Sequence, residues 1–514
     1  MGAGKQIEIM DCTLRDGEQT NGVSFLPHEK LVIARALLSD VKVDRVEVAS
    51  ARVSEGEKEA VRMICRFAKA NRLLHKIEVL GFVDGKQSVD WISACGCQVI
   101  NLLAKGSLKH CALQLKKTPQ EHIADILNVL SYAEAQGVKV NLYLEDWSSG
   151  MKDSPDYVFQ LMDTLHDKPV LRFMLPDTLG ILTPHQTEAY MGMMTRRYPD
   201  CHFDFHAHND YDLAVANSLA AVKAGARGLH VTVNGLGERC GNAPLSSVHV
   251  VLKDMCHMPT PIDESSLVDV THLVEGYSGI AVSPNTPVVG DNVFTQVAGV
   301  HADGDNKDKL YCNELAPERF GRHREYALGK NSGKANIIQN LNELGLELTP
   351  EQTKAVTKRI TQLGDRKELV TQDDLPYIVS DVLKHNTPNE VVKLLSYMVS
   401  TSYGLRPIAS LKISVHGTVY EEDASGDGQY DAFVKALRKI YKHRLNRVFP
   451  LLENYQVSIP PGGRTDALVQ TIITWRREDG RIFRTRGLDA DQTEAAIKAT
   501  IKMLNIIEAP EQEN

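Results

Sequence analysis

The chain has 514 residues, a formal net charge of −8, a pI near 6.2 and 43% hydrophobic residues. This length predicts two or three domains, and the composition is typical of a globular protein with a large buried core. The acidic balance argues against a nucleic-acid partner, and no apolar run approaches the ~18 residues that a membrane span needs. Nine cysteines without a secretory signal pattern indicate reduced thiols, so we expect a cytoplasmic protein.

The first half of the chain alternates short apolar β-rich runs with longer helical patterns. The runs that we expect to be strands are Ile7–Asp11, Arg45–Ala49, Lys76–Gly81, Gln98–Ala104, Lys139–Leu144, Arg172–Leu175, His202–His206 and Gly228–Val233. Eight β-then-α units in about 250 residues predict a closed (β/α)8 TIM barrel, with a doubly wound open sheet as the competing layout. Polar residues at the ends of these strands favour the barrel, because TIM barrels build their active sites on that face.

The β/α alternation stops after Pro259-Thr-Pro261, where two prolines mark the end of the regular pattern. Residues 335–400 are expected to be mostly helical, and strand patterns return at 411–415 and 417–420, followed by a helix over 430–441. A second set follows, with strands at 456–459, 468–476 and 481–485, a turn at Pro460–Gly463 and a helix over 489–504, before a tail at 508–514. We therefore predict a barrel over residues 1–262, a helical subdomain over 263–404 and a C-terminal α+β domain over 405–514.

The segment Phe203-Asp-Phe-His-Ala-His208 is the sharpest local signal for chemistry. Residues two apart on a strand face the same way, so His206 and His208 would point at one spot. Asp16 closes the first strand, which lies beside the eighth strand in a closed barrel, and Asn242 could add a weaker oxygen ligand. Such a donor set suits zinc, manganese, cobalt or iron. The alternatives are an accidental His-X-His and an asparagine that only holds its own loop.

Three more residues at strand ends are candidates for catalysis. Arg15 can donate hydrogen bonds to a carbonyl or a developing oxyanion, or it forms an ion pair across the barrel mouth. Glu145 ends an apolar strand and is the best-placed general base, unless it is a solvated strand-end acid. Thr178 can bind a substrate carboxylate or cap the following helix.

Three motifs together resemble those of a known enzyme family. Asp11-Cys-Thr-Leu-Arg-Asp-Gly-Glu-Gln19, His206-Ala-His-Asn-Asp210 and Asn234-Gly-Leu-Gly-Glu-Arg-Cys-Gly-Asn242 are similar to signatures of the isopropylmalate, homocitrate and citramalate synthases. The resemblance covers nearly the whole chain. It implies a Claisen-type condensation of acetyl-CoA with a 2-oxo acid, a bound divalent metal (Zn, Mn, Mg or Co) and a homodimer whose subunits exchange parts.

The same resemblance assigns roles to individual residues. It implies that Asp16, His206 and His208 hold the metal with Asn242 beside them. It also implies that Arg15 polarises the substrate, that Glu145 is catalytic and that Thr178 binds the substrate carboxylate. His301 and Tyr311 resemble the two residues that the partner subunit lends to the site, although Tyr311 lies one residue further from Pro317 than expected.

The pocket residues indicate which 2-oxo acid fits. Isopropylmalate synthases usually show Ser-Pro-Glu where this chain has Tyr143-Leu-Glu145, and tend to carry Asn where it has Met174. A tyrosine fills space, and Tyr143 with Leu80 and Leu103 is similar to the pyruvate pocket of citramalate synthases. We therefore expect pyruvate as substrate and (R)-citramalate as product, with 2-oxoisovalerate as the alternative substrate. The other reading of the two leucines is ordinary barrel core.

The C-terminal region resembles the domain of this family that binds an end-product amino acid. That effector would be isoleucine for a citramalate synthase and leucine for an isopropylmalate synthase. Tyr430 and Asp431 are candidate effector contacts, or they only stabilise a helix N-terminus. A metal-dependent aldolase or acyl-CoA lyase on the same barrel is the alternative from another class, and a catalytically dead binding subunit is a further one.

Overall fold

The computed structural model describes residues 6–298, 300–301, 304, 310–330, 332–344, 346, 348–365, 370, 375, 378–379, 382, 391–458, 469–478, 480 and 482–508. The chain forms two compact units, one of residues 1–296 and 304–325 and the other of residues 297–303 and 326–514. Within the described residues, no helix is long and apolar enough to cross a membrane.

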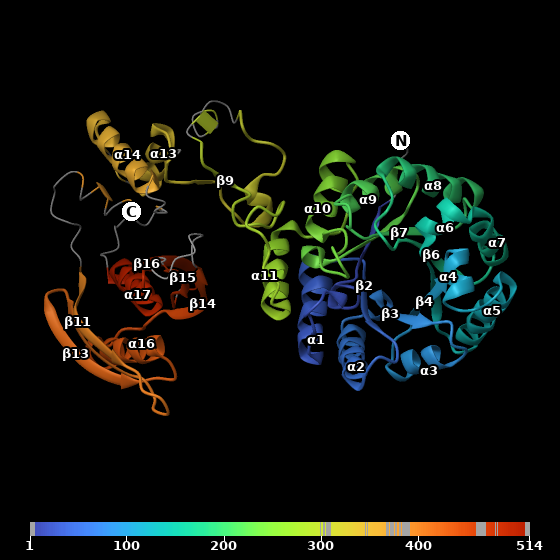
Figure 1. Cartoon of the computed structure of the whole chain (residues 1–514), viewed down its shortest axis with the longest axis horizontal. Helices are drawn as coiled ribbons and strands as arrows, with labels where there is room; N and C mark the ends of the chain where they lie inside the picture. The colour runs from blue at the N-terminus through green and yellow to red at the C-terminus, as the bar shows by residue number, and fades with distance from the viewer. Residues whose placement is uncertain are drawn as a thin grey trace. The chain divides into compact units, whose positions relative to one another are not determined.

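The first unit contains a closed barrel of eight parallel strands in sequence order, seen at the right of Figure 1. The strands are β1 (Glu8–Asp11), β2 (Arg45–Ser50), β3 (Ile77–Phe82), β4 (Val99–Lys105), β5 (Lys139–Glu145), β6 (Val170–Asp177), β7 (Phe203–Ala207) and β8 (Gly228–Val231). The pairing of β1 with both β2 and β8 closes the barrel. The predicted TIM barrel is confirmed, and the open sheet is excluded.

Helices surround the strands (Figure 1). They are α1 (Pro27–Arg35), α2 (Glu55–Ala70), α3 (Gln87–Ala94), α4 (Leu108–Leu113), α5 (Pro119–Ala135), α6 (Trp147–Asp153), α7 (Pro155–Leu165), α8 (Pro184–Arg197), α9 (Ala214–Lys223), α10 (Leu245–Val250) and α11 (Leu267–Ser278). Local sequence starts several of them: Thr118 and Thr183 each cap a helix with proline next and Glu or Gln at the third position.

Alternation along the strands separates two kinds of side chain. Outward residues such as Val46, Val48 and Leu102 are fully buried in the large core that includes apolar residues of the surrounding helices. Inward residues of the same strands include Arg45 and Glu47, which are also buried. TIM-barrel interiors are dominated by branched aliphatic residues. A charged interior is therefore a departure, and it leads directly to the site.

The second unit begins with a helical part built around α13 (Lys334–Glu343) and α14 (Pro350–Asp365), which share a small apolar core. The helical prediction for residues 335–400 is wrong at its end, where β11 (Val392–Ser400) pairs antiparallel with β12 (Ile408–Val415). The apolar residues of Val392–Ser400 do not alternate strictly with polar ones, so the sequence pattern alone does not predict a strand there. The short strands β9 (Thr295–Gln296) and β10 (Glu325–Tyr326) pair with each other.

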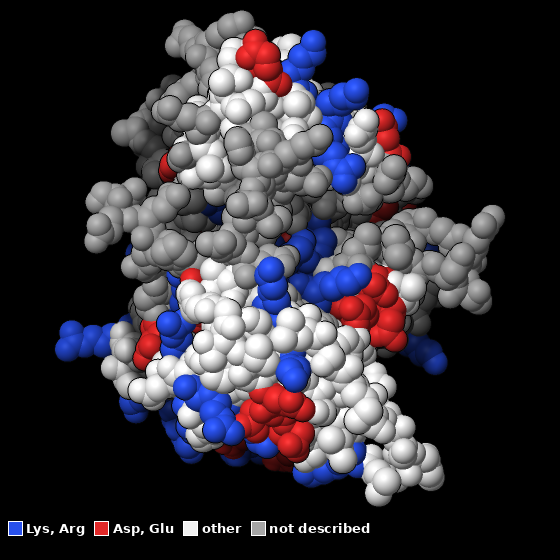
Figure 2. Space-filling view, turned by 90° about the vertical axis from the view of Figure 1, so that its left-hand side faces the viewer, with Lys and Arg blue, Asp and Glu red and all other residues white. Residues whose placement is uncertain are grey.

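The C-terminal module has two similar halves. Each is a three-stranded antiparallel sheet followed by a helix: β11, β12 and β13 (Thr418–Ser425) with α16 (Gln429–Lys439), then β14 (Leu451–Ser458), β15 (Val469–Arg476) and β16 (Ile482–Asp489) with α17 (Gln492–Glu508). Trp475 and Phe433 are buried in the core that both halves share. Figure 2 shows basic and acidic side chains interspersed over the described part of one face.

Shorter 3-10 and π-helical turns connect these elements. They are η1 (Gly17–Gln19), η2 (Ala36–Val41), η3 (Leu74–Lys76), η4 (Val233–Gly235), η5 (Val251–Met255), η6 (Glu264–Ser266), η7 (Pro317–Phe320) and η9 (Ile440–Leu445). The turn predicted at Pro460–Gly463 and the tail beyond Glu508 lie outside the described residues.

The buried carboxyl group of Asp11 makes the stability of the barrel depend on pH. One oxygen accepts the backbone N–H of Thr13 at 2.8 Å, and the other has no hydrogen-bond partner among the described residues. Burial raises the pKa of Asp11 from 3.8 to about 7, against a smaller lowering by the Thr13 bonds. At a pH between these two pKa values, Asp11 is ionised in the unfolded chain but protonated in the folded chain. The free energy of unfolding therefore falls as pH rises through this range.

We predict that Asp11→Asn removes this loss. The free energy of unfolding of the variant, relative to that of the parent chain, should grow by up to about 3 kcal/mol between pH 5 and pH 8. Thermal unfolding of both proteins at the two pH values measures it, with Asp40→Asn, at an exposed position, as the control for removing a charge. An identical difference in melting temperature at both pH values would contradict the prediction.

Candidate metal centre

Three of the predicted ligands converge at the C-terminal end of the barrel. Asp16 follows β1, while His206 lies on β7 and His208 follows it. The Nε2 atom of His206 lies 3.1 Å from Oδ2 of Asp16 and 3.4 Å from Nε2 of His208, which is 3.9 Å from the same oxygen. All three are buried, and one ligand atom from each lies within 4.8 Å of the others. One ion can therefore contact all three.

The electrostatics keep these groups in their metal-binding forms. Burial raises the pKa of Asp16, but Arg15 and His206 outweigh it and hold this pKa well below its ordinary value. Burial lowers the pKa of His206, and burial together with His206 lowers the pKa of His208 to about 4. At neutral pH the site thus offers one carboxylate and two neutral imidazoles, which suit a divalent ion.

Asn242 offers its amide oxygen as a fourth candidate donor. It pairs with His208 in an isolated β-bridge, and its side-chain N–H donates to the carbonyl of Leu236 at 3.1 Å. The buried amide oxygen of Asn242 has no hydrogen-bond partner in the described part of the chain. Gly237 keeps the loop close, because a Cβ there would stand 2.2 Å from Nδ2 of Asn242. The amide nitrogen thus holds the loop while the oxygen stays available, so the residues fit a metal.

Arg15 is fixed from inside the barrel. Its Nε donates to Oε2 of Glu47 at 2.6 Å, and its Nη1 lies 3.4 Å from Oδ2 of Asp16. Asn101 donates to the other oxygen of Glu47 at 2.8 Å, and Asn141 donates to Asn101 at 2.8 Å. Arg15 thus forms an ion pair with Glu47, and its guanidinium lies next to Asp16 of the candidate metal site. Sequence reasoning missed Glu47, whose signal was an acid at an inward position of an apolar strand.

An apolar cluster lies in the same end of the barrel. Tyr143, Leu80 and the partly buried Leu103 pack together with Met10, Cys12 and Met174. Met10 and Cys12 were not predicted from the sequence as members of this cluster. The cluster is separate from the large core outside the strands. The Tyr143 ring makes an edge contact with the His206 ring at 6.2 Å, and the Arg15 guanidinium lies 6.0 Å from its centroid. These six side chains thus form an apolar wall next to the candidate metal ligands.

Glu145 and Thr178 lie at the ends of neighbouring strands. The Glu145 carboxylate pairs with Lys105 at the end of β4, and it is about a quarter exposed. The Thr178 hydroxyl accepts the backbone N–H of Asp146 at 2.9 Å. It does not cap α8, because Thr183 does. Sequence reasoning missed Lys105, a charged residue at the inward end of a strand.

The remaining predicted site residues do not belong to the barrel strands. His301 belongs to the second unit and Tyr311 to the first, and both are exposed. Tyr430 and Asp431 lie at the start of α16 and line a cavity of about 620 Å³ within the C-terminal module. The Tyr430 hydroxyl is 2.6 Å from Oγ1 of Thr500, and its ring stacks at a tilt on Tyr455.

Three family models match successive parts of the chain. A family model described as HMGL-like matches residues 6–274, more than half of the chain. A model described as homocitrate synthase post-HMGL domain-like matches residues 288–368, and one described as LeuA allosteric (dimerisation) domain matches residues 369–508.

Relatives match over nearly the full length. A protein of Methanopyrus kandleri that carries the name (R)-citramalate synthase CimA is 33% identical, covering 98% of this chain and 97% of its own. The chain belongs to the citramalate and isopropylmalate synthase family. Family members named as 2-isopropylmalate synthases are equally similar: one from M. kandleri is 35% identical over 97% of this chain and 98% of its own, and one from Methanocaldococcus jannaschii 34% over 98% and 95%. This synthase is therefore an acyl-CoA-dependent condensing acyltransferase.

We predict that His208→Ala weakens divalent-metal binding of the synthase by at least about 100-fold. The loss follows because the variant removes one of the two imidazole donors of the site. Metal content after dialysis measures it, with His185→Ala, at an exposed position on α8, as the matched control. Parent-like metal content in folded His208→Ala would show that the metal lies elsewhere.

Proposed function

We propose that the synthase condenses acetyl-CoA with pyruvate and releases (R)-citramalate and CoA. The observation that carries the choice of pyruvate is the apolar cluster of Tyr143, Leu80 and Leu103 beside the metal ligands. Pyruvate presents a methyl group to this wall, whereas 2-oxoisovalerate presents an isopropyl group. The second candidate is 2-isopropylmalate synthesis, which the names of equally similar relatives favour.

We propose that Asp16, His206, His208 and Asn242 hold the divalent ion, which can be Zn, Mn, Mg or Co. When bound, the ion supplies a Lewis acid for the keto and carboxylate oxygens of the 2-oxo acid. Arg15, held by Glu47, donates to the keto oxygen as negative charge develops there. Thr178 keeps its hydroxyl proton free for the substrate carboxylate, because its oxygen already accepts from Asp146.

The condensation requires one proton removal and one carbon–carbon bond. A base takes a proton from the acetyl methyl group, the resulting carbanion attacks the keto carbon of pyruvate, and the alkoxide that forms on the keto oxygen takes up a proton. Water then cleaves the thioester and releases CoA. Glu145 is our candidate base, with Lys105 fixing its carboxylate at the end of β5. We further propose a homodimer in which His301 and Tyr311 complete the site of the second copy.

We also propose that the C-terminal module, over residues 405–514 together with β11, is regulatory. Residues 263–404 apart from β11 would link it to the barrel and complete the partner site. The cavity of about 620 Å³ has the chemistry for an amino acid. The N-terminal ends of α16 and α17 line it and suit a carboxylate, while Asp431 suits an ammonium group. Tyr430 and Tyr455 supply apolar faces. Isoleucine, the end product downstream of citramalate, is the effector that we propose.

We predict that the parent enzyme releases CoA faster with pyruvate than with 2-oxoisovalerate, and that Leu103→Ala shrinks this preference about 10-fold or more. A pocket discriminates by roughly 1–3 kcal/mol per methylene, so added space admits the larger acid. The ratio of kcat/KM for the two acids measures the effect. Leu102→Ala is the matched control, because Leu102 is next to Leu103 in the chain but its side chain is buried in the core outside the strands.

A parent preference for 2-oxoisovalerate would overturn the pyruvate assignment in favour of isopropylmalate synthesis. Retro-aldol cleavage without condensation of any 2-oxo acid would instead support an aldolase or lyase. Full activity after metal removal with a chelator would contradict both condensing functions.

We predict that Asp431→Asn raises the isoleucine concentration for half-inhibition about 10-fold or more, because a charge-assisted hydrogen bond is lost. The ratio of rates with and without isoleucine measures this. Asp427→Asn is the matched control, since Asp427 lies just before the same helix but does not line the cavity. Equal inhibition of the two variants would place the effector elsewhere.

A further inference from the structure

We propose that His230 is a positioning residue that anchors the Tyr143 hydroxyl and thereby fixes the wall of the 2-oxo acid pocket. The identity of the substrate rests on the proposed function, but the anchoring does not. His230 lies on β8 inside the barrel and is 1% exposed, and Tyr143 on β5 is 2% exposed. The hydroxyl of Tyr143 is 3.0 Å from Nδ1 of His230, across the barrel interior.

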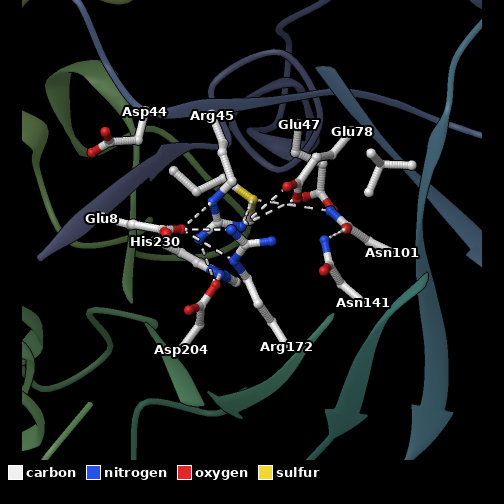
Figure 3. A network of polar contacts seen from close by, with 12 residues as sticks. Glu8, Asp44, Arg45, Glu47, Glu78, Asn101, Asn141, Arg172, Asp204 and His230 are labelled. Atoms are coloured by element: carbon white, nitrogen blue, oxygen red, sulfur yellow. Dashed lines mark hydrogen bonds and ion pairs between the residues drawn. The ribbon is translucent and has the colours of Figure 1, made fainter. Parts of the chain in front are cut away.

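The other side of the His230 ring is held in turn. Its Nε2 is 3.1 Å from Oδ2 of Asp204, and the same oxygen accepts from Nη2 of Arg45 at 2.6 Å. Figure 3 shows Arg45 in the middle of this network, with Glu8 and Glu78 also pointing toward its guanidinium. The contacts thus run from Arg45 through Asp204 and His230 to Tyr143.

The direction of the hydrogen bonds follows from the chemistry of the groups. A carboxylate can only accept, so Nε2 of His230 carries the proton and donates to Asp204. In the neutral ring Nδ1 is then an acceptor, and the Tyr143 hydroxyl must donate to it. This commits the hydroxyl proton of Tyr143 to the barrel interior and turns its ring toward the pocket. A phenylalanine could fill the same space but would leave Nδ1 of His230 unpaired.

Backbone close to the network makes room for it. Gly228 lies on β8, and a Cβ added there would stand 2.0 Å from Oδ1 of Asp204 and 3.1 Å from Nη2 of Arg45. Any side chain at this position would displace the carboxylate that holds His230.

The network is costly to bury, which indicates a function beyond filling the barrel. Well-packed hydrophobic residues in place of a buried ion pair are often neutral or stabilising. This barrel nevertheless places Arg45, Asp204 and His230 where aliphatic side chains are usual. Their contacts end on Tyr143, whose ring meets His206 and Arg15. The ring can therefore set both the size of the pocket and its distance from the metal.

Three variants of the full chain test the anchoring. In His230→Leu the acceptor is gone; in His230→Gln an amide can still donate to Asp204 and accept from Tyr143; in Tyr143→Phe the ring stays but the hydroxyl is gone. For each, kcat and KM are measured with pyruvate and with 2-oxoisovalerate, together with metal content. We expect His230→Leu and Tyr143→Phe to raise KM for the preferred acid and to shrink the preference at least ten-fold, with parent-like metal content. We expect His230→Gln to keep the parent preference.

A folded, metal-loaded His230→Leu with the parent preference overturns the proposal. Equal loss of activity toward both acids in His230→Leu also overturns it, because that result reports a merely structural role. If His230→Leu does not fold, Tyr143→Phe decides, and an unchanged preference there overturns the anchoring. A parent enzyme that prefers 2-oxoisovalerate defeats the proposed function alone, because the anchoring is judged from the change between parent and variant.

Discussion

The guanidinium group of Arg45 is the point on which the interior of the barrel depends. It is almost fully buried, and Glu8, Glu78 and Asp204 surround it within 3.3 Å. Burial would lower the pKa of Arg45, but these carboxylates outweigh it and raise this pKa well above its ordinary value. A buried charge costs several kcal/mol unless partners compensate it, so each of these side chains requires the others.

Two lines of polar contacts connect this interior to the chemistry. Asp204 and His230 lead from Arg45 to Tyr143 on one side, and Asn141, Asn101 and Glu47 lead to Arg15 on the other. Both lines end next to the candidate metal ligands Asp16 and His206. The strand alternation that sends apolar side chains outward sends these groups inward. The same period of two thus builds the outer core and positions the site.

Much of this could be predicted because it is local in the chain. Period-two runs and helix caps define the β/α units, and strand ends place Asp16, His206 and His208 on one face. What could not be predicted depends on packing across the barrel. Glu47 pairs with Arg15 and Lys105 pairs with Glu145, and the two partners in each pair come from different β/α units. The strand β11 was mistaken for helix because its antiparallel partner β12, not its own propensity, makes it a strand.

The central claim is that a buried polar scaffold holds Tyr143 and Arg15 against a metal at Asp16, His206 and His208. A crystal structure of the full chain with a divalent ion and pyruvate, with anomalous scattering to locate the ion, tests it most directly. We predict the ion among these three side chains, with the Tyr143 hydroxyl still on His230 and Arg15 still on Glu47. An ion bound elsewhere, or a Tyr143 ring turned away from His230 in the loaded site, would contradict the account.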